Sequence, residues 1–324
     1  MKLSVSERCW PIRGSFTISR GSKTHADTII VEIEHRGVIG RGECVPYPRY
    51  GESLESVKAE IASVADKVEA GITREQLQDL LPPAAARNAL DCAMWDLECK
   101  LQGCSIWQKL NLQANRLETA YTISLDDPEK MEQVAKENAF RSLLKIKLGG
   151  SGDLERLRAV RNGAPATNII IDANEAWTPE LYRQLLPQLL MLDIMMIEQP
   201  FPAGDDAALA ELPRPIPICA DESCHDRNSL ADIIGRYDMI NIKLDKTGGL
   251  TEALLLKAEA KKLGLNVMVG CMVSSSLSMA PAFVLGQGAD IIDLDGPLLL
   301  NQDIENGFDF NGSQMFPFKS QLWG

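Results

Sequence analysis

Short apolar runs that end in a charged residue recur along the second half of the chain at a nearly constant spacing. Successive charged residues are separated by about 22 to 26 residues: Lys147, Asp172, Glu198, Asp221 and Lys243. A helical pattern follows each run, so the spacing predicts a β-α repeat. With the strand-like segment 119–125 there are eight candidate strands, which predict a parallel barrel with an irregular last unit. A doubly wound sheet stays open, but no Gly-rich phosphate loop follows an early strand.

The first hundred or so residues show a different pattern. Residues 27–43 read as strands joined by turn residues, with a hairpin signal at 35–37. Helical patterns follow at 53–70 and 85–103, and Gly103 supplies a stop. Strands followed by helices predict a small α+β unit.

Composition excludes several classes of partner. The 324 residues are 45% hydrophobic and 24% charged, as in globular proteins. The net charge of -12 argues against nucleic acid or an anionic membrane surface as partner. No apolar stretch approaches the roughly 20 residues of a membrane helix, and the first residues lack the apolar core of a signal peptide. Eight cysteines without paired spacing predict free thiols, and the cytoplasm is the expected location.

The ends of the predicted strands hold an unusual number of charges. In a parallel barrel the active site lies at the carboxyl ends of the strands. One aspartate there is usually a helix N-cap. Three carboxylates on consecutive strands, with lysines on the strands before and after, are more than capping explains. The charged residues at these ends are Lys145, Lys147, Asp172, Glu198, Asp221, Lys243, Asp293 and Asp295.

Three converging carboxylates require a cation. The oxygen ligands of Asp172, Glu198 and Asp221 suit Mg²⁺ and leave coordination positions for water and substrate oxygens. Zinc amidohydrolase chemistry is disfavoured, because none of the three histidines (25, 35 and 225) stands at a strand end. Asn174 follows Asp172 by two residues and is a candidate for a contact with the metal's surroundings or the substrate, or a turn residue.

The lysines suggest what the metal is for. A carboxylate bound to Mg²⁺ makes the neighbouring α-proton more acidic, because the metal stabilises the resulting enediolate. Nearby cations lower the pKa of a lysine toward the working pH, so a neutral amine can take that proton. Lys147 and Lys243 come from nearly opposite sides of the barrel, which is the geometry of epimerisation by two bases. A Schiff-base lysine would leave the three carboxylates unexplained.

Several short motifs occur in order along the chain: "KIK", "DANEAW", "EQP", "ADES" and "NIKLDKTGG", with "GECVPYPRYGES" and "ARNALDCAMWDLECK" in the N-terminal part. Together they resemble the motifs of the enolase superfamily, muconate-lactonizing subgroup. Within the subgroup the sequence is most similar to dipeptide epimerases of the L-Ala-D/L-Glu type. The resemblance implies Lys147 and Lys243 as acid/base catalysts and Lys145 as a helper near the metal-bound carboxylate. It also implies one Mg²⁺ per site, held by the three carboxylates.

The resemblance extends to substrate contacts. The pair Asp293 and Asp295 is expected to receive the free ammonium of a dipeptide, the alternative being an acidic strand end beside a turn. The loop 19–25 is expected to select the epimerised side chain. Arg20, Lys23 or His25 could meet a glutamate γ-carboxylate there, and Lys23 stands where relatives selective for glutamate often have arginine. A lysine supplies the charge without the planar fork of arginine.

The loop 46–53, "PYPRYGES", is expected to be a lid over the site, with Tyr50 as a substrate contact. Met191, Met195 and Met196 are predicted to pack in the core.

We therefore expect an α/β protein: a modified TIM barrel (β/α)7β over 118–297, an α+β capping domain at 1–117, and a tail at 298–324 that returns to the cap. The expected reaction is Mg²⁺-dependent epimerisation of L-Ala-D-Glu or L-Ala-L-Glu, in peptidoglycan peptide recycling. The alternatives are an N-acylamino acid racemase, o-succinylbenzoate synthase or muconate-type cycloisomerase on the same fold, and a noncatalytic binding protein. The sequence leaves open whether the chain forms a homo-oligomer.

Overall fold

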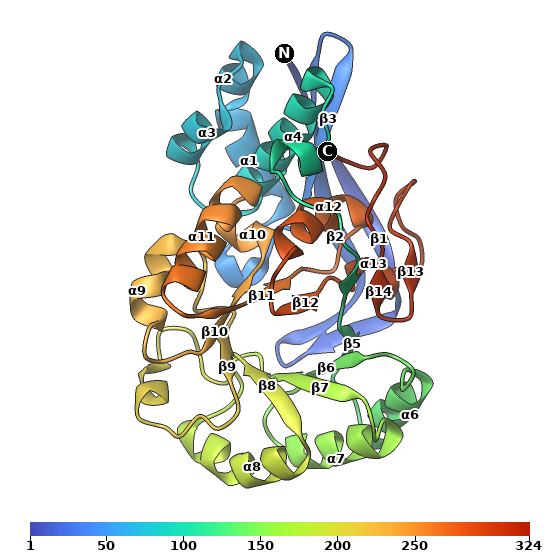
Figure 1. Cartoon of the computed structure of the whole chain (residues 1–324), viewed down its shortest axis with the longest axis vertical. Helices are drawn as coiled ribbons and strands as arrows, with labels where there is room; N and C mark the ends of the chain where they lie inside the picture. Colours follow the sequence, from blue (N-terminus) through green and yellow to red (C-terminus); the bar gives the residue numbers. More distant parts are fainter.

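The computed structural model describes all 324 residues and places an antiparallel sheet with its helices above a parallel barrel (Figure 1). Every apolar run that was expected to be a barrel strand forms one. Their spatial order follows their order in the chain. The strands are β5 (Tyr121–Ile123), β6 (Leu143–Lys147), β7 (Asn168–Asp172), β8 (Ile194–Glu198), β9 (Ile218–Ala220), β10 (Met239–Ile242), β11 (Asn266–Gly270) and β12 (Ile291–Asp293). The predicted α/β barrel with an N-terminal cap is confirmed.

Residues just before β5 close the barrel. The hydrogen-bonded ladder runs from β5 to β12 but does not join these two strands directly. Instead Thr119 forms a parallel bridge with Ile292, and the amide of Ala120 donates to the carbonyl of Ile292 at 2.8 Å. The Thr119 hydroxyl also accepts from the amide of Leu294 at 2.8 Å. These contacts bring the last strand, with its acidic residues, beside the first.

The helices that follow the strands are regular except after β8 and β9. The β8–β9 connection has only the 3-10 turn η2 (Ala207–Ala210), since five prolines between residues 200 and 217 cannot sustain a helix. The β9–β10 connection has η3 (Arg227–Ser229) and the short α9. The other helices are α6 (Pro128–Glu137), α7 (Asp153–Gly163), α8 (Pro179–Met191), α9 (Leu230–Ile233), α10 (Leu244–Thr247), α11 (Leu250–Lys262), α12 (Ser276–Gly286) and α13 (Gly296–Leu299).

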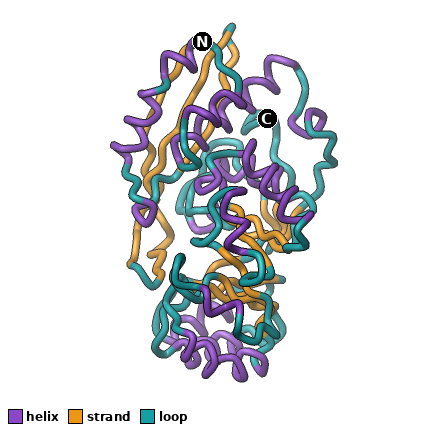
Figure 2. The backbone as a smooth tube through the Cα atoms, turned by 90° about the vertical axis from the view of Figure 1, so that its left-hand side faces the viewer, coloured by secondary structure: helices purple, strands orange, loops and turns teal.

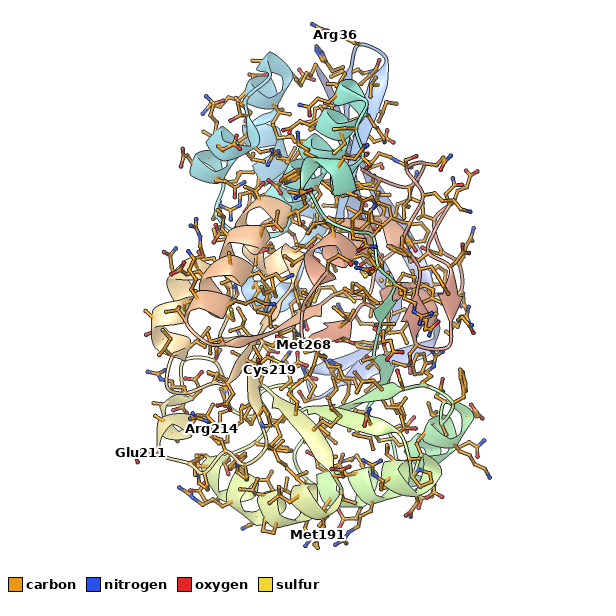
Figure 3. The ribbon with its side chains drawn as sticks, in the orientation of Figure 1. Arg36, Met191, Glu211, Arg214, Cys219 and Met268 are labelled. Atoms are coloured by element: carbon orange, nitrogen blue, oxygen red, sulfur yellow. The ribbon has the colours of Figure 1, made fainter.

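Side-chain alternation sorts each barrel strand into an outer and an inner face. In β6 the side chains of Leu144 and Ile146 join the large core under the helices. Residues of the inner face form a separate small cluster, and Figure 3 places two of them, Cys219 and Met268, in the middle of the barrel. Asp172, Glu198 and Asp221 lie two positions beyond Ile170, Met196 and Cys219 on the same faces and therefore form a layer above this apolar one. The inner cluster is Ala120, Ile170, Met196, Cys219, Met239 and Met268.

The cap packs a helical layer against one three-stranded sheet. Helix α4 lies against β3, where Gly40 and Gly42 leave no room for a side chain: a Cβ there would collide with the carbonyls of Ala93 and Ala89. These glycines therefore set the close approach of helix and sheet. The elements are β1 (Lys2–Ile18), β2 (Gly21–His35), β3 (Val38–Cys44), η1 (Pro48–Tyr50), α1 (Leu54–Ser63), α2 (Ala65–Ala70), α3 (Arg74–Leu80), α4 (Ala85–Gln102) and α5 (Ile106–Lys109).

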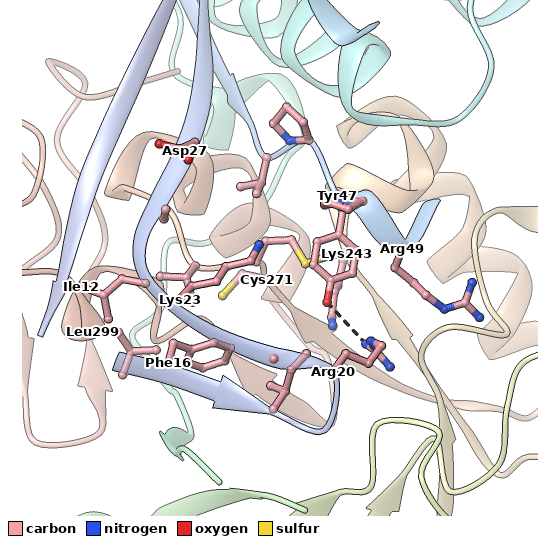
Figure 4. Close-up of a pocket in the computed structure, with 18 of the residues that line it drawn as sticks. Ile12, Phe16, Arg20, Lys23, Asp27, Tyr47, Arg49, Lys243, Cys271 and Leu299 are labelled. Atoms are coloured by element: carbon pink, nitrogen blue, oxygen red, sulfur yellow. Dashed lines mark hydrogen bonds between the residues drawn. The ribbon is translucent and has the colours of Figure 1, made fainter. Parts of the chain in front are cut away.

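Strand β1 was not expected from the sequence. It pairs with β2 along nearly its whole length, and the register shifts between Pro11 and Phe16. A bulge at this point absorbs a proline and a glycine, Gly14, that would interrupt a regular strand. The two strands form a long ribbon along one side of the molecule (Figure 2), and its hairpin end reaches the mouth of the barrel (Figure 4).

The C-terminal tail contacts the cap. The indole N–H of Trp323 donates to the carbonyl of Cys92 at 3.0 Å, and the amide of Gly324 donates to Asp96 at 2.7 Å. Before this, the tail forms a small sheet of β4 (Leu117–Glu118), β13 (Phe310–Asn311) and β14 (Gln314–Met315). The domain limits at 117/118 and 297/298 stay predictions.

The methionine prediction is wrong at two positions. Met191 and Met195 are 70% and 46% exposed, whereas Met196 is 1% exposed. Both exposed residues flank the turn between α8 and β8, at the surface of the molecule, and Met191 lies at the end furthest from the cap (Figure 3). All eight cysteines are free thiols, as expected. None of the helices combines the length and the apolar character needed to cross a membrane.

Candidate active site

A cavity of about 920 Å³ lies between the charged layer of the barrel and the cap. The barrel contributes Lys145, Lys147 and Lys243 to its wall. The cap contributes the β1–β2 hairpin and the segment 45–54. Figure 4 shows Arg20, Lys23, Tyr47 and Lys243 around this space, with Ile12, Phe16 and Leu299 grouped at one side. The structure therefore brings residues of both domains to one site.

The three predicted carboxylates meet at one point. Asp172 and Glu198 end β7 and β8, and Asp221 follows β9 directly. One carboxylate oxygen from each lies within 4.8 Å of the other two, and all three side chains are buried. Three like charges this close repel each other unless cations neutralise them. The triad therefore has the ligand type and the geometry of a site for a hard divalent metal ion.

Two lysines flank the triad from opposite sides. The ammonium of Lys147 is 2.6 Å from Asp172 Oδ2, and that of Lys243 is 2.6 Å from Asp221 Oδ2. Because β6 and β10 are four strands apart in a barrel of eight, these lysines face each other across the site. Burial disfavours charge on Asp172, but Lys147 and Lys145 outweigh it and lower its pKa to about 2. Burial likewise opposes charge on Lys243, but Asp221 and Glu198 hold its pKa well above the usual value, opposite to the lowering expected from the sequence. A divalent ion held by these carboxylates would counter their charge and favour the neutral amine.

Lys145 connects the triad to Asp293, the first residue of the acidic pair, at the end of β12. Its ammonium is 2.6 Å from Glu198 Oε2, 2.8 Å from Asp293 Oδ2 and 3.4 Å from Asp172 Oδ2. Only 1% of this lysine is exposed, so it is a fully buried cation among carboxylates. Burial alone would lower the pKa of Lys145, but Asp293, Glu198 and Asp172 raise it well above its usual value.

The second member of the acidic pair lacks a cation. Asp295 Oδ2 accepts the amide of Thr122 at 2.6 Å, and no lysine, arginine or histidine nitrogen lies within 4.0 Å of its carboxylate. Burial, together with the negative charge of Asp293, raises the pKa of Asp295 to about 7. Asp293 Oδ1 is also buried without a hydrogen-bond partner. The pair thus offers buried acceptor oxygens to the cavity.

The guanidinium of Arg20 is bound by carboxylate and carbonyl groups of the protein itself. Its guanidinium is 2.7 Å from Glu222 Oε1 and 3.0 Å from Glu175 Oε2, and it donates to the carbonyl of Asn174 at 3.0 Å. A longer contact of 3.4 Å reaches the hydroxyl of Tyr47 (Figure 4, dashed line). Arg20 therefore ties the hairpin to the loops after β7 and β9.

Lys23, unlike Arg20, has no carboxylate partner. Its ammonium lies 5.4 Å from the centre of the Tyr47 ring, and no carboxylate oxygen is within 4.0 Å. Lys23 pairs with Phe16 across the hairpin, so segment 19–25 is a turn followed by strand rather than the expected loop. His25 Nδ1 lies 2.9 Å from the hydroxyl of Thr24.

Asn174 and Tyr50 also line the cavity. Asn174 has a positive φ of 47°, its amide N–H donates to Asp172 Oδ1 at 2.9 Å, and its side-chain oxygen is buried without a partner. Tyr50 ends η1 in the 46–53 segment and packs edge-on against His225 with ring centres 4.7 Å apart. Burial and the charge of Asp221 raise the pKa of its hydroxyl.

Two further buried residues support the triad and were missed in the sequence. Lys246 donates to Asp221 Oδ1 at 2.6 Å and to the carbonyl of Asn241 at 3.0 Å. Asn241 Nδ2 donates to Glu198 Oε1 at 2.7 Å, and Gly270 leaves the space that its amide fills. Alternation pointed to Asn241, which shares the inner face with Lys243. Nothing local pointed to Lys246, because it lies in the helix α10.

Fold and site together define an α/β-barrel protein with a buried acidic triad between opposed lysines. Residues 1–110 match the family "Mandelate racemase / muconate lactonizing enzyme, N-terminal domain", and residues 126–294 match "Enolase C-terminal domain-like". The chain belongs to this mandelate racemase/muconate lactonizing branch of the enolase superfamily.

Two characterised relatives are similar over nearly the whole chain. The L-Ala-D/L-Glu epimerase of Escherichia coli (strain K12) is 45% identical over 316 residues, which cover 97% of this chain and 98% of the relative. The N-acetyl-D-glutamate racemase of Pseudoalteromonas sp is 42% identical over 300 residues, covering 91% and 95%. Both are isomerases of amino acid derivatives.

Solved structures share the fold over nearly the whole chain. An enolase family member from Agrobacterium tumefaciens with homology to dipeptide epimerases, with bound sodium and L-Ala-L-Glu, has 54% identity and a TM-score of 0.98 over 99% of each chain. A dipeptide epimerase from Enterococcus faecalis V583, complexed with Mg and L-Leu-L-Tyr, has 28% identity and a TM-score of 0.91 over 98% of this chain and 96% of that one.

Proposed function

We propose that this protein is a Mg²⁺-dependent isomerase that epimerises the α-carbon of the C-terminal residue of a dipeptide, with L-Ala-L-Glu and L-Ala-D-Glu as favoured substrates. The observation that supports it most directly is the pair Lys147 and Lys243, on opposite sides of the acidic triad and open to one cavity. Relatives that interconvert L-Ala-D/L-Glu or bind Mg with a dipeptide support the same conclusion.

The two lysines would exchange roles with the direction of the reaction. One neutral amine removes the α-proton from its face of the substrate and leaves a planar enediolate. The opposite ammonium then delivers a proton to the other face, which inverts the carbon. Asp172, Glu198 and Asp221 would hold one Mg²⁺, whose positive charge makes the α-proton of a carboxylate substrate more acidic.

The remaining charges orient the substrate. Lys145, the buried cation between Glu198 and Asp293, would add positive charge beside the reacting carboxylate. The acceptor oxygens of Asp293 and Asp295 would receive the ammonium of the first residue, since Asp293 Oδ1 has no hydrogen-bond partner and the buried Asp295 has no cation beside it.

The hairpin and the lid segment would contact the epimerised side chain. Lys23 is the available cation for a γ-carboxylate. Arg20 would position the hairpin through its ion pairs with Glu175 and Glu222. Asn174 and Tyr50 would complete the substrate contacts from the barrel and the lid. We place the reaction in the cytoplasm, where free thiols persist, and in the recycling of peptidoglycan peptides.

Proton NMR in D₂O tests the function. L-Ala-L-Glu and L-Ala-D-Glu are each incubated with enzyme and Mg²⁺. The glutamate α-proton signal should disappear while the other diastereomer accumulates. If neither glutamate dipeptide exchanges but another dipeptide does, the choice of side chain is wrong. Absence of exchange across a dipeptide library would overturn the dipeptide assignment.

The second candidate is racemisation of an N-acylated amino acid, favoured by the N-acetyl-D-glutamate racemase among the relatives. Such a substrate has no ammonium for Asp295 to bind.

We expect Asp295→Asn to lower kcat/KM for L-Ala-L-Glu by about 10- to 100-fold, which is the contribution of one charged hydrogen bond, and to leave kcat/KM for N-acetyl-L-glutamate unchanged.

Because the pKa of Asp295 is about 7, the wild-type kcat/KM for the dipeptide should rise as the pH increases through that value and the carboxylate ionises. Asp295→Asn should lose this limb of the pH profile. Equal losses for both substrates would contradict the ammonium site and favour the racemase.

Lys23 should set the preference for glutamate. Lys23→Ala is expected to lower kcat/KM for L-Ala-L-Glu by about 10- to 100-fold, because the γ-carboxylate loses a charged partner, and to leave L-Ala-L-Leu unchanged. Lys23→Arg should retain or tighten the preference by offering two parallel donors. Lys67→Ala, at an exposed lysine in α2, is the matched control and should change neither kcat/KM. An unchanged ratio of the two substrates in Lys23→Ala would exclude this role.

A further inference from the structure

Gln199 occupies an unusual position next to the acidic triad. It follows Glu198 directly, none of its surface is exposed, and its φ of 35° lies in the left-handed region. For a residue with a side chain this backbone conformation is unfavourable, and it persists only where the surroundings require it. The contacts of Gln199 show what those surroundings are.

The side-chain amide of Gln199 binds the strand end that holds Asp221. Its Oε1 accepts the backbone N–H of Asp221 at 2.8 Å and that of Ser223 at 3.1 Å. Its Nε2 lies 2.9 Å from each of three acceptors, the carbonyl of Phe201 and the hydroxyls of Ser223 and Tyr237. The amide therefore has a partner for every donor and acceptor.

The backbone of Gln199 reaches the strands on both sides. Its N–H donates to the carbonyl of Cys219 in β9 at 2.9 Å. Its carbonyl accepts the N–H of Glu175, in the loop after β7, at 2.9 Å. One residue thus links the ends of the three strands that hold Asp172, Glu198 and Asp221.

The outer part of this network does not touch the triad. The hydroxyls of Tyr237 and Ser223 both donate to Asp206 Oδ2 at 2.6 Å, and Asp206 pairs with Arg236 at 3.0 Å. Tyr237 is therefore a contact of Gln199 on the side away from Asp221, which makes it a suitable comparison.

We propose that Gln199 is a positioning residue for the metal site: its amide fixes Asp221 relative to Glu198 and Asp172, so that three mutually repelling carboxylates are held together before the ion binds. Gln199 acts through Asp221 and is itself no metal ligand. The proposal rests on the Mg²⁺ site of the proposed function, but it is independent of which substrate the enzyme uses.

Calorimetric titration of the metal-free protein with Mg²⁺, without substrate, tests the proposal. Gln199→Met keeps the volume and removes both hydrogen bonds to the strand end. We expect it to weaken Mg²⁺ binding by about 10- to 100-fold, as loss of supporting contacts does at other metal sites. Tyr237→Phe, the comparison variant, should lower the thermal midpoint but keep the wild-type Mg²⁺ affinity. Wild-type affinity in Gln199→Met, or equal losses in both variants, would overturn the proposal.

Gln199→Glu covers the case in which Gln199→Met does not fold. A glutamate oxygen can still accept the N–H groups of Asp221 and Ser223, so Mg²⁺ affinity should be retained although the donors are lost. A loss of affinity with this variant would also overturn the proposal. Since no substrate is present, failure here is distinct from failure of the epimerase assignment, which the NMR experiment measures.

Discussion

Replacing Lys147 or Lys243 by alanine should abolish interconversion of L-Ala-L-Glu and L-Ala-D-Glu. Removing a general acid/base typically costs about 10²- to 10⁴-fold in rate, and each variant lacks one of the two groups that inversion needs. The lysine that remains still faces one side of the α-carbon. Each variant should therefore exchange the α-proton of one epimer with D₂O and leave the other epimer unlabelled, and the two variants should retain opposite epimers.

The control for these variants is Lys257→Ala. Lys257 in α11 is partly buried and binds the carbonyls of Leu285 and Gln287, outside the cavity. Its loss should lower the thermal midpoint without changing the exchange of either epimer. The exchange is measured by NMR at the glutamate α-proton. If Lys147→Ala exchanged this proton in both epimers, a single base would serve both directions.

Removing the divalent ion should abolish activity as completely as removing a lysine, and Mg²⁺ should also stabilise the fold. In the metal-free protein the triad is balanced only by neighbouring lysines. An ion that binds only the folded state adds about 2.7 kcal/mol at a concentration of 100 times its Kd. The thermal midpoint of the chelator-treated protein should therefore rise on addition of Mg²⁺, and α-proton exchange should return with it.

Glu198→Gln provides the matched test of the ion. The change keeps the size of the side chain and removes one of the three ligand charges, so the Mg²⁺-induced rise in midpoint and the recovery of exchange should both be lost. Glu180→Gln changes an exposed side chain of α8 and should keep the wild-type rise in midpoint and recovery of exchange. Full Mg²⁺-dependent exchange by Glu198→Gln would place the ion elsewhere.

Local sequence pattern was sufficient for the barrel and for the layer of charges. Side chains alternate along a strand, so a charge at the end of an apolar run points inward together with the residue two positions before it. Lys147, Asp172 and Glu198 could be placed on one inner layer for this reason alone. The β-α spacing then brought their strand ends to one face.

Local pattern failed where a residue's surroundings come from distant parts of the chain. Strand β1 is held by its partner β2, so the interruptions at Pro11 and Gly14 did not predict its length. Met195 sits in a strand that reads as core, yet its side chain is 46% exposed. In both cases packing against other elements, which no local pattern records, decided the outcome.

The amino-acid sequence by itself determined the barrel strands, their order and the type of charge at each strand end, because these depend on spacing along the chain. Only the tertiary structure decided the partners of those charges. Lys145 forms an ion pair with Asp293 because the barrel closes. Arg20 forms ion pairs with Glu175 and Glu222, whereas Lys23 has no carboxylate partner. An ion pair depends on distance in space, and closing the barrel and docking the cap are what set that distance.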